Sequence, residues 1–317
     1  MKRLGVVFFV LFHAVLVLGA AWAPYSTHEQ NRRLSFAPPT VVYGDDGMGN
    51  RGAFVRQPAR RPGDAATYHR LRWLERDPDD ELRLFRTDAP SGAHFLGTDR
   101  YGRDMLSRVL HAGRLSLLSG IWASCMAVAA GLTIGALCVL FGGVVDRGLM
   151  GLVDLIQTLP WLCLLLAFRA FLPLRMDSER LFVLTIILVG SLALAYPARL
   201  ARGAMWAAMQ QDYVKVAIGF GVSKGYLFWR HLVPHARDRL LTHWALLIPR
   251  CVMAEVMLSF FGLGAEDASP SLGNLLMDLT EAGGAVTHPW MYSPVVVLGL
   301  AVLSYHLLAE ALQSRLD

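Results

Sequence analysis

Six long apolar runs dominate the chain, and polar segments separate them. A helix of about 20 apolar residues is long enough to cross the hydrocarbon core of a bilayer, and tilting accommodates longer runs. The pattern therefore predicts an all-α integral membrane protein. Its six transmembrane helices are expected at residues 4–22, 115–141, 149–172, 181–200, 241–262 and 292–312.

Composition supports this class. Of the 317 residues, 54% are hydrophobic and 17% are charged, whereas soluble domains carry about 25% charged residues. Gly131 and Gly135 form a G-x-x-x-G pattern within the second run. This pattern is typical of a close-packing helix face, although glycines are also common in membrane helices generally.

The polar segments between the runs predict an orientation. The 200–240 loop is basic, whereas the 263–291 loop carries acidic residues and no Lys or Arg. Short basic loops stay in the cytoplasm, while long translocated segments escape this rule. We therefore expect both termini in the cytoplasm and residues 24–113 outside it. The basic residues of the 200–240 loop include Arg202, Lys215, Lys224, Arg230, Arg237 and Arg239.

The first run has two interpretations. Lys2 and Arg3, an apolar run and the sequence Ala21-Trp22-Ala23 could form a cleaved secretory signal. However, Pro24 would follow the cut, and the run is longer than a usual signal core. We expect an uncleaved membrane anchor.

Residues 24–93 have a different character, rich in Arg and Asp and punctuated by Pro and Gly. Such composition predicts an exposed extracytoplasmic insertion, with one short helix near 66–76 and a strand or two around 81–86. Opposite charges alternate, which argues against a nucleic-acid partner because phosphate binding requires a surplus of Lys and Arg. A solvated face and a docking surface for a partner protein both remain open.

A polar, basic stretch at residues 210–234 lies between two apolar runs, and its apolar residues recur at roughly helical spacing. It resembles the EAA loop of binding-protein-dependent ABC importer permeases, which couples the permease to its ATPases. Lys215-Val216-Ala217 stand at the Glu-Ala-Ala triplet, and Gly221 and Pro234 stand at the family's glycine and proline. The chain departs from the family pattern at four positions. Lys215 replaces the Glu and Val216 the first Ala of the triplet, and His231 replaces the Ile and Val233 the Leu of the final I-x-L-P.

Two further segments extend the resemblance. HFLGTDRYGRDMLSRVLHAGRLSLLSG at 94–120 is similar to a segment of the dipeptide/oligopeptide/nickel permease subfamily, and AEVMLSFFGLGAEDASPSLGNLL at 254–276 is similar to another. The three segments occur in the family's order and cover most of the chain. The matching motif residues in the first of these two segments are Gly97, Thr98, Asp99, Gly102, Arg103, Asp104, Ser107 and Arg108. His94 and Asp99 are expected to form local hydrogen bonds that shape the start of the second span.

The resemblance implies a type I ABC importer permease fold with an insertion between the first two helices. It implies an N-terminal transmembrane helix at 1–23 and an extracytoplasmic segment at 24–113. It also implies a five-helix core at 114–312, which includes the cytoplasmic EAA loop at 200–240. A cytoplasmic tail would follow at 313–317. The implied location is the bacterial inner membrane.

The implied partners are a second homologous permease, two cytoplasmic ATP-binding subunits, an extracytoplasmic solute-binding protein and membrane lipid. Movement of a helix at 213–229 would drive alternating access. The residues expected to couple to the ATPases are Asp212, Tyr213, Val214, Lys215, Ala217, Gly221, Phe228 and Pro234, with Phe220 as a further apolar anchor. For Gly221 we expect a turn with positive φ or a close backbone approach to the ATPase, the alternative being a tolerated helix glycine.

The chain carries no recognisable catalytic motif. A G-x-x-x-x-G-K-[ST] phosphate loop is absent from the sequence, so ATP is expected to be bound by partner subunits and no cofactor by this chain. Cys125, Cys138, Cys163 and Cys251 lack C-x-x-C spacing and are expected to pack as small apolar residues. His231 and His235 are four apart, but Pro234 interrupts them, so no metal site is expected.

Charged residues within predicted spans include Asp154, Arg169, Glu255 and Glu310. Glu255 lies at mid-span, where exposure to lipid is costly, so it should face the bundle interior, either sealing a helix contact or lining the pathway. A secondary transporter and a membrane-anchored scaffold remain as alternative classes; the former usually has broken midplane helices, which the sequence does not suggest. Peptides are the default solute, with nickel and other small solutes as alternatives.

Overall fold

The structure is a computed structural model that describes residues 2–45, 51–57, 67–76, 82–89, 92–171, 177–262, 264, 270–281 and 287–313. The chain divides into two units. Unit 1 comprises Met1–Phe9, Ser116–Leu258 and Ala301–Asp317, and unit 2 comprises Val10–Leu115 and Ser259–Leu300. Three helices contribute long stretches to both units: α1 (Lys2–Ala21), α2 (Met105–Phe141) and α11 (Ser293–Gln313).

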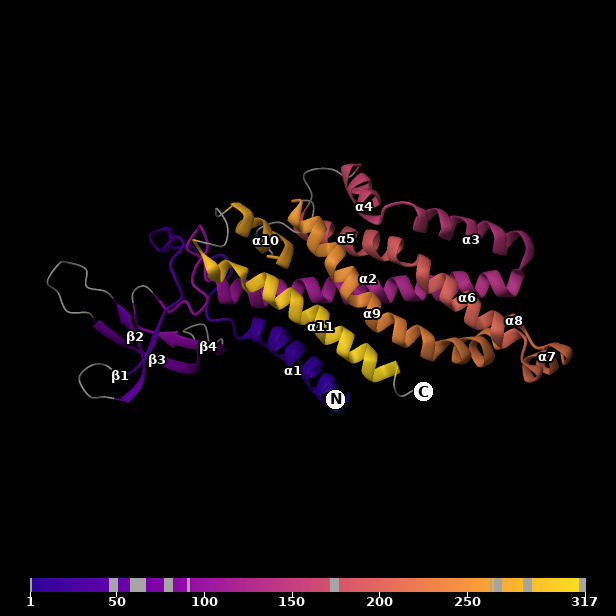
Figure 1. Ribbon diagram of the computed structural model, residues 1–317, viewed down its shortest axis with the longest axis horizontal. Coiled ribbons are helices and arrows are strands. Elements are labelled where there is room, and N and C mark those ends of the chain that lie inside the picture. Colours follow the sequence, from indigo (N-terminus) through magenta and orange to yellow (C-terminus); the bar gives the residue numbers. More distant parts are fainter. Residues whose placement is uncertain are drawn as a thin grey trace. The chain divides into compact units, whose positions relative to one another are not determined.

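Unit 2 contains a four-stranded antiparallel sheet in the order β1-β2-β3-β4 (Figure 1). Its strands are β1 (Val42–Asp45), β2 (Arg51–Gln57), β3 (Thr67–Arg76) and β4 (Leu82–Thr87). Val55, Leu71 and Phe85 from three of these strands form a small buried core with Ala93. Unit 2 also holds η1 (Arg32–Leu34), α10 (Leu272–Glu281) and η3 (Pro289–Tyr292).

The sheet corrects two expectations. The protein is mostly helical but not all-α, and residues 67–76 form a strand rather than the expected short helix. Tyr68 and Trp73 belong to the residue types that favour strands. Leu71 turns into the core while both of its neighbours are exposed, as strand alternation requires. The strand expected around 81–86 is confirmed as β4.

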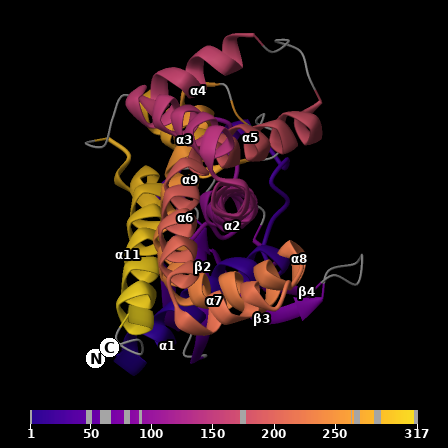
Figure 2. The same ribbon diagram turned by 90° about the vertical axis from the view of Figure 1, so that its right-hand side faces the viewer.

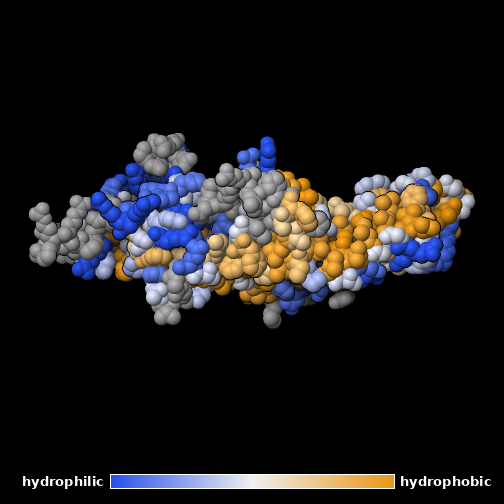
Figure 3. Space-filling model, turned by 90° about the horizontal axis from the view of Figure 1, so that it is seen from above, coloured by the Kyte–Doolittle hydropathy of each residue, from blue (hydrophilic) through white to orange (hydrophobic). Residues whose placement is uncertain are grey.

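Unit 1 is helical. Its elements are α3 (Gly143–Thr158), α4 (Trp161–Ala170), α5 (Ser178–Ala193), α6 (Ala195–Met209), α7 (Asp212–Gly219), α8 (Lys224–Leu227), the π-helix η2 (Phe228–Leu232) and all but the last two residues of α9 (Val233–Phe260). Figure 2 views the end of α2, beside which α6 packs against α3. Figure 3 shows hydrophobic residues gathered over these helices, whereas hydrophilic residues gather over the strands of unit 2.

Within the described ranges, four helical segments are long and apolar enough to cross a membrane, and the number rises to six if each of two bent helix pairs counts as one span. The single segments are Leu4–Ala21, Met105–Phe141, Lys224–Phe260 and Pro289–Gln313. The bent pairs are Gly143–Thr158 with Trp161–Ala167 and Arg180–Ala193 with Ala195–Met209. They correspond to the spans expected at 149–172 and 181–200.

These two spans are broken, contrary to the expectation of continuous helices. The first pair bends by 93° where Leu159 precedes Pro160. Leu159 is extended (φ −81°, ψ 140°), as the steric demand of a following proline favours. The second pair bends by 45° at Leu194, one turn before Pro197, which cannot donate a helix hydrogen bond to the preceding turn.

The glycine pattern in α2 is a close-packing face. A Cβ on Gly131 would lie 2.7 Å from the Pro197 Cβ, and one on Gly135 would lie 2.7 Å from the Ala201 Cβ. Both neighbours belong to α6. The absence of side chains at the two glycines therefore allows the two helix backbones to approach each other.

Candidate functional site

The polar stretch 210–234 folds as the short helix α7, a turn, and the start of an uninterrupted helix that runs from α8 through η2 into α9. α7 ends at Gly219, and α8 begins after Ser223, whose Oγ accepts a hydrogen bond from the Tyr226 N–H at 3.3 Å. Gly221 lies in the turn with φ 76°. The expected continuous helix over 213–229 is therefore wrong, while the expected positive φ at Gly221 is confirmed. Among the described residues, no heavy atom beyond Gly221 and its two chain neighbours lies within 4 Å of a Cβ built on Gly221.

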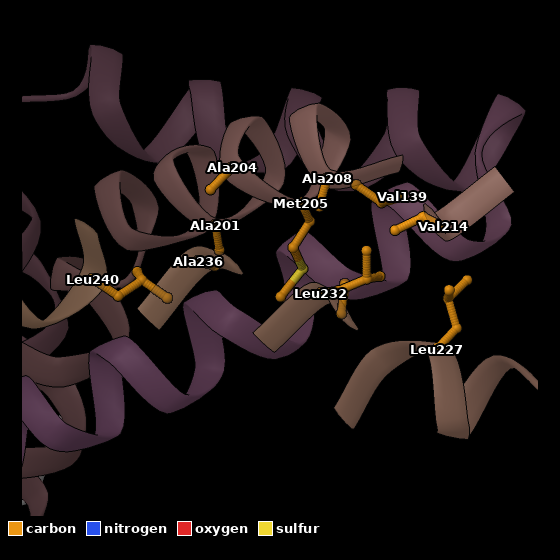
Figure 4. Close-up of a cluster of buried hydrophobic side chains, with 11 residues drawn as sticks. Val139, Ala201, Ala204, Met205, Ala208, Val214, Leu227, Leu232, Ala236 and Leu240 are labelled. Atoms are coloured by element: carbon orange, nitrogen blue, oxygen red, sulfur yellow. The ribbon is translucent and has the colours of Figure 1, made fainter. Parts of the chain in front are cut away.

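A buried apolar core holds this segment against the ends of the long helices (Figure 4). Val214 of α7 and Leu227 of α8 pack with Met205 of α6, Val139 of α2 and Leu232 of η2. The side chains drawn in Figure 4 point toward one another from these elements. α7 and α8 therefore pack against α2, α6, η2 and α9 through one shared core.

Two of the residues expected to anchor a partner face inward instead. Val214 is fully buried, and Phe228 packs against the same core. Both faces of the segment are rich in apolar residues, so spacing alone did not distinguish the inner face from the outer one.

The outer surface of the segment is aromatic and basic. Phe220 at the turn is 84% exposed, and Tyr213, Tyr226 and Trp229 are also exposed. Sequence reasoning missed Tyr226 and Trp229, although aromatic residues in a polar loop are themselves a signal for an interface. Of the other expected coupling residues, Asp212, Lys215, Gly221 and Pro234 are exposed and Ala217 is partly buried.

Two lysines on this surface each contact one neighbouring side chain. The Lys215 Nζ lies 3.7 Å from an oxygen of Asp212, one helical turn away. The Lys224 Nζ lies 4.0 Å from the centre of the Phe141 ring, at the end of α2. Exposed pairs of this kind are weak, so both cations remain available to a partner.

The second motif segment forms a buried ion cluster in unit 2. The Asp99 carboxylate is fully buried and accepts hydrogen bonds from Arg103 Nε at 2.6 Å and from Arg108. Its other oxygen accepts the Tyr101 and Arg103 N–H groups at 2.8 and 2.9 Å. Arg108 Nη2 also lies 3.3 Å from Asp278 of α10. The cluster therefore ties the motif loop, α2 and α10 together.

Asp104 fixes the start of α2. One of its oxygens lies 2.9 Å from the His94 Nδ1, and the other accepts the Ser107 N–H and Oγ–H at 2.8 and 2.7 Å. Tyr25 donates its N–H to the Ser107 Oγ, while its phenol oxygen accepts the Ala93 N–H. Burial raises the pKa of Tyr25 to about 12. The expected local hydrogen bonding of His94 and Asp99 is confirmed.

The remaining motif residues allow close backbone packing. Gly97 and Gly102 have φ of 63° and 71°. A Cβ on Gly97 would lie 2.7 Å from the Ala37 carbonyl oxygen, and one on Gly102 would collide with the Asn31 carbonyl. The Thr98 Oγ1 accepts the Ala37 N–H at 2.8 Å. In this structure the eight motif residues organise the fold of unit 2.

A half-open cavity of about 750 Å³ is formed by residues of unit 1. Its walls are mostly apolar and come from the two helix breaks, from α9 around Pro249 and from α11. The polar residues on its walls are Gln157, Tyr196, Arg250, Cys251 and His306. Sequence reasoning missed Arg250, even though the residue lies within the span expected at 241–262.

The charged residues expected within spans differ in their burial. Glu255 is 3% exposed, which confirms that it is buried in the helical bundle. It is not among the residues that line the cavity, which favours helix packing. Asp154 accepts a hydrogen bond from Arg199 Nε at 3.1 Å, and Glu310 is exposed. The side chain of Arg169 lies outside the described residues, as do Glu266 and Asp267 of the acidic loop.

Comparison with known proteins agrees with this arrangement. Residues 127–317 match the family described as binding-protein-dependent transport system inner membrane component. A peptide permease protein of Brucella suis is 30% identical over 246 residues, covering 77% of this chain and 80% of the relative. The oligopeptide transport system permease protein OppC of Haemophilus influenzae is 30% identical, covering 71% and 70%. The glutathione transport system permease protein GsiD of Pectobacterium atrosepticum is 29% identical, covering 73% and 74%.

A solved structure shares the fold. A chain from inward-facing structures of the MetNI methionine ABC transporter aligns with a TM-score of 0.53 and 15% identity, covering 67% of this chain and 98% of that chain. The fold is thus the type I ABC importer permease fold. Since the family match spans more than half of the chain, this protein belongs to the binding-protein-dependent transport system inner membrane component family of ABC importer permeases.

Proposed function

We propose that this chain is one of two permease subunits of an ATP-driven importer for short peptides. The observation that carries the proposal is the 212–234 segment, which combines an exposed aromatic and basic surface with a buried core that reaches three long helices. An amphipathic helix that presents aromatic side chains is suited to a groove on a soluble partner. The proposed partner at this surface is a cytoplasmic ATP-binding subunit.

The rest of the assembly follows from the family. A second permease completes the translocation pathway, two ATP-binding subunits supply the energy, and an extracytoplasmic binding protein delivers the solute. This chain binds no ATP itself, because its sequence contains no phosphate-binding loop. Its role is to convert movement of α7 and α8 into a rearrangement of the helices around the cavity.

The proposed topology has six crossings, with each bent pair counted as one span and both termini in the cytoplasm. It is supported by the basic 200–240 loop and by the acidic character of 263–291. The sheet of unit 2 would then lie outside the cytoplasm, where it could contact the binding protein. Reporter fusions at residue 60, residue 225 and the C-terminus should report outside, inside and inside; an outside C-terminus would contradict the topology.

The solute class is proposed from the relatives, which are named for peptide, oligopeptide and glutathione transport. Nickel and other small solutes are the alternatives. Secondary transport and a scaffold role are disfavoured by the family, although the broken helices expected of secondary transporters do occur here.

Reconstitution tests the proposal. A tagged copy of this chain, expressed with the genes adjacent to its own, should co-purify with two ATP-binding subunits and a second permease. In proteoliposomes with the binding protein, the complex should accumulate radiolabelled trialanine only when ATP is present. The purified single chain should not bind ATP at micromolar concentrations. Uptake without ATP-binding subunits would contradict the proposed mechanism.

A further inference from the structure

Arg250 occupies an unusual position for a permanently charged side chain. It lies in α9, ten residues before the helix ends at Phe260, which corresponds to about 15 Å along the helix axis. The side chain is exposed and lines the cavity of unit 1. In the part of the chain that the structure describes, no carboxylate lies within ion-pairing distance of Arg250.

A charge at this depth requires an aqueous or polar environment. Charged residues within membrane helices face a bundle interior or a water-filled cavity and mark solute pathways, because contact with lipid is expensive. Glu255 on the same helix is buried, whereas Arg250 is exposed and lines the cavity. Arg250 is therefore the charged group of α9 that a solute in the cavity would meet.

The walls of the cavity support a solute site. They include Leu159 and Trp161 on either side of the first helix break, and Ala193 and Ala195 on either side of the second. Irregular backbone is tolerated within a membrane where it lines a cavity or is buried in protein, and transporters place such breaks at their solute sites. The volume of about 750 Å³ falls within the range of small-molecule sites.

We propose that Arg250 recognises a carboxylate of the solute as the solute passes through this cavity. An arginine presents a planar fork of donors that matches a carboxylate through two parallel hydrogen bonds. The apolar walls would accommodate the body of the solute, and Gln157, Tyr196 and His306 supply polar contacts. The solute is then an organic acid with an apolar part, such as a peptide with a free C-terminus. A free divalent cation is disfavoured because Arg250 would repel it.

This inference rests on the proposed function, and a thiol-labelling experiment tests it without knowledge of the solute. In the assembled complex, with the four native cysteines of this chain replaced by Ser, Gln157→Cys places a reporter thiol on the cavity wall. The reporter is reacted with the anionic sulfonatoethyl and the cationic trimethylammonium-ethyl methanethiosulfonates. The ratio of anionic to cationic rates should fall roughly tenfold when Arg250→Gln is added, and Arg250→Lys should restore most of it.

The control reporter is Trp73→Cys in β3, an exposed position outside the cavity wall, where Arg250→Gln should leave the ratio unchanged. Two outcomes would overturn the inference. A ratio at the cavity reporter that is insensitive to Arg250→Gln would show that Arg250 does not set the potential in the cavity. Failure of both reagents to reach the cavity reporter would show that lipid or the second permease fills the cavity.

Uptake into proteoliposomes provides the second measurement. Arg250→Gln should lower the uptake of radiolabelled trialanine roughly tenfold, as expected for the loss of a charge-assisted pair, while Arg250→Lys retains a larger share. Uptake by Arg250→Gln at the wild-type rate would overturn the inference. Failure of the wild-type complex to move trialanine would instead contradict peptide transport, and the thiol-labelling ratio would still report on Arg250.

Discussion

Gly135 of α2 packs directly against Ala201 of α6, so closely that a Cβ on Gly135 would lie 2.7 Å from the Ala201 Cβ and 2.7 Å from the Arg202 N. Real Cβ atoms do not approach backbone atoms this closely, so any side chain at Gly135 must push the two helices apart. Close approach of helix backbones at small residues is a principal source of association between membrane helices. The contact joins α2 to α6, the helix that precedes α7.

Gly135→Ala should therefore destabilise the protein, although alanine is the better helix former by about 1 kcal/mol. Gly203→Ala is the matched control, because Gly203 lies in α6 with no atom near its Cβ. We expect a lower midpoint of thermal aggregation in detergent for Gly135→Ala and an equal or higher one for Gly203→Ala. Equal midpoints for the two variants would show that the helices can separate at no cost.

Gly221→Val should abolish uptake while leaving membrane insertion and pairing with the second permease intact. The reason is backbone conformation rather than crowding: Gly221 has φ 76° with open space around it, and β-branched residues strongly disfavour positive φ. The turn between α7 and α8 would change, and the exposed aromatic surface with it. Co-purification of the ATP-binding subunits and ATP-dependent uptake measure the effect.

Gly221→Asn provides the decisive comparison, because asparagine tolerates positive φ better than other residues with a side chain. It should retain a substantial part of the uptake. Gly225→Ala in α8, another exposed glycine with no near neighbours, should be close to wild type. Wild-type uptake by Gly221→Val would remove the proposed coupling role of this turn.

Glu255→Cys should resist labelling by a lipid-soluble maleimide in the assembled complex. The Glu255 side chain is 3% exposed, and a charge facing lipid at mid-span would cost about 2.5 to 3.5 kcal/mol. Leu11→Cys on α1, whose parent side chain is 60% exposed, should label readily from the lipid phase. Comparable labelling at the two positions would reject the buried placement of Glu255.

Asp99→Asn should destabilise unit 2 strongly, because it removes the carboxylate charge nearest to the buried Arg103 and Arg108 and leaves them with the more distant Asp278. Breaking a buried ion pair in this way costs about 3–5 kcal/mol. Glu75→Gln, which removes an exposed pair with Arg72 in the same unit, should cost no more than about 1 kcal/mol. Thermal unfolding in detergent compares the two, and a similar shift for both would argue against a structural role for the cluster.

The apolar runs were sufficient to predict where helices occur, because continuous hydrophobic stretches of membrane length are characteristic of membrane-spanning helices. They were insufficient to predict where helices break. Pro160 was visible in the sequence, but its effect on Leu159 was hidden inside an apolar run that satisfied the length rule. The break at Leu194 has no proline of its own and depends on Pro197, one turn later.

In the candidate site, too, some residues could be predicted from the sequence and others could not. The motif residues from Gly97 to Arg108 could be found by resemblance. Their buried partner Asp278 could not, because in the sequence it is one of several acidic residues of the 263–291 loop, and only the fold places it beside Arg108. The inward placement of Val214 depends on packing with α6 and η2, which spacing along one segment does not contain. Arg250 lay within a predicted span and was overlooked, and its importance became visible only with the cavity.

The π-helix η2 affects which insertions and deletions the helix from Lys224 to Phe260 can accept. From Lys224 to Phe260 the chain is helical without interruption, and η2, which carries the exposed Trp229, lies between α8 and Arg250. Each residue of an α-helix advances the angle about the axis by about 100°. A π-helix holds more residues per turn than an α-helix, so η2 can lose one residue and become α-helical with little rotation of the flanking helix. Deleting one residue between Val233 and Arg250, where the helix is regular, would instead rotate Arg250 by about that angle relative to α8. Insertions or deletions within that regular part should preserve both surfaces only in steps of about seven residues, or two full turns, so it fixes the angle between the two surfaces about the helix axis.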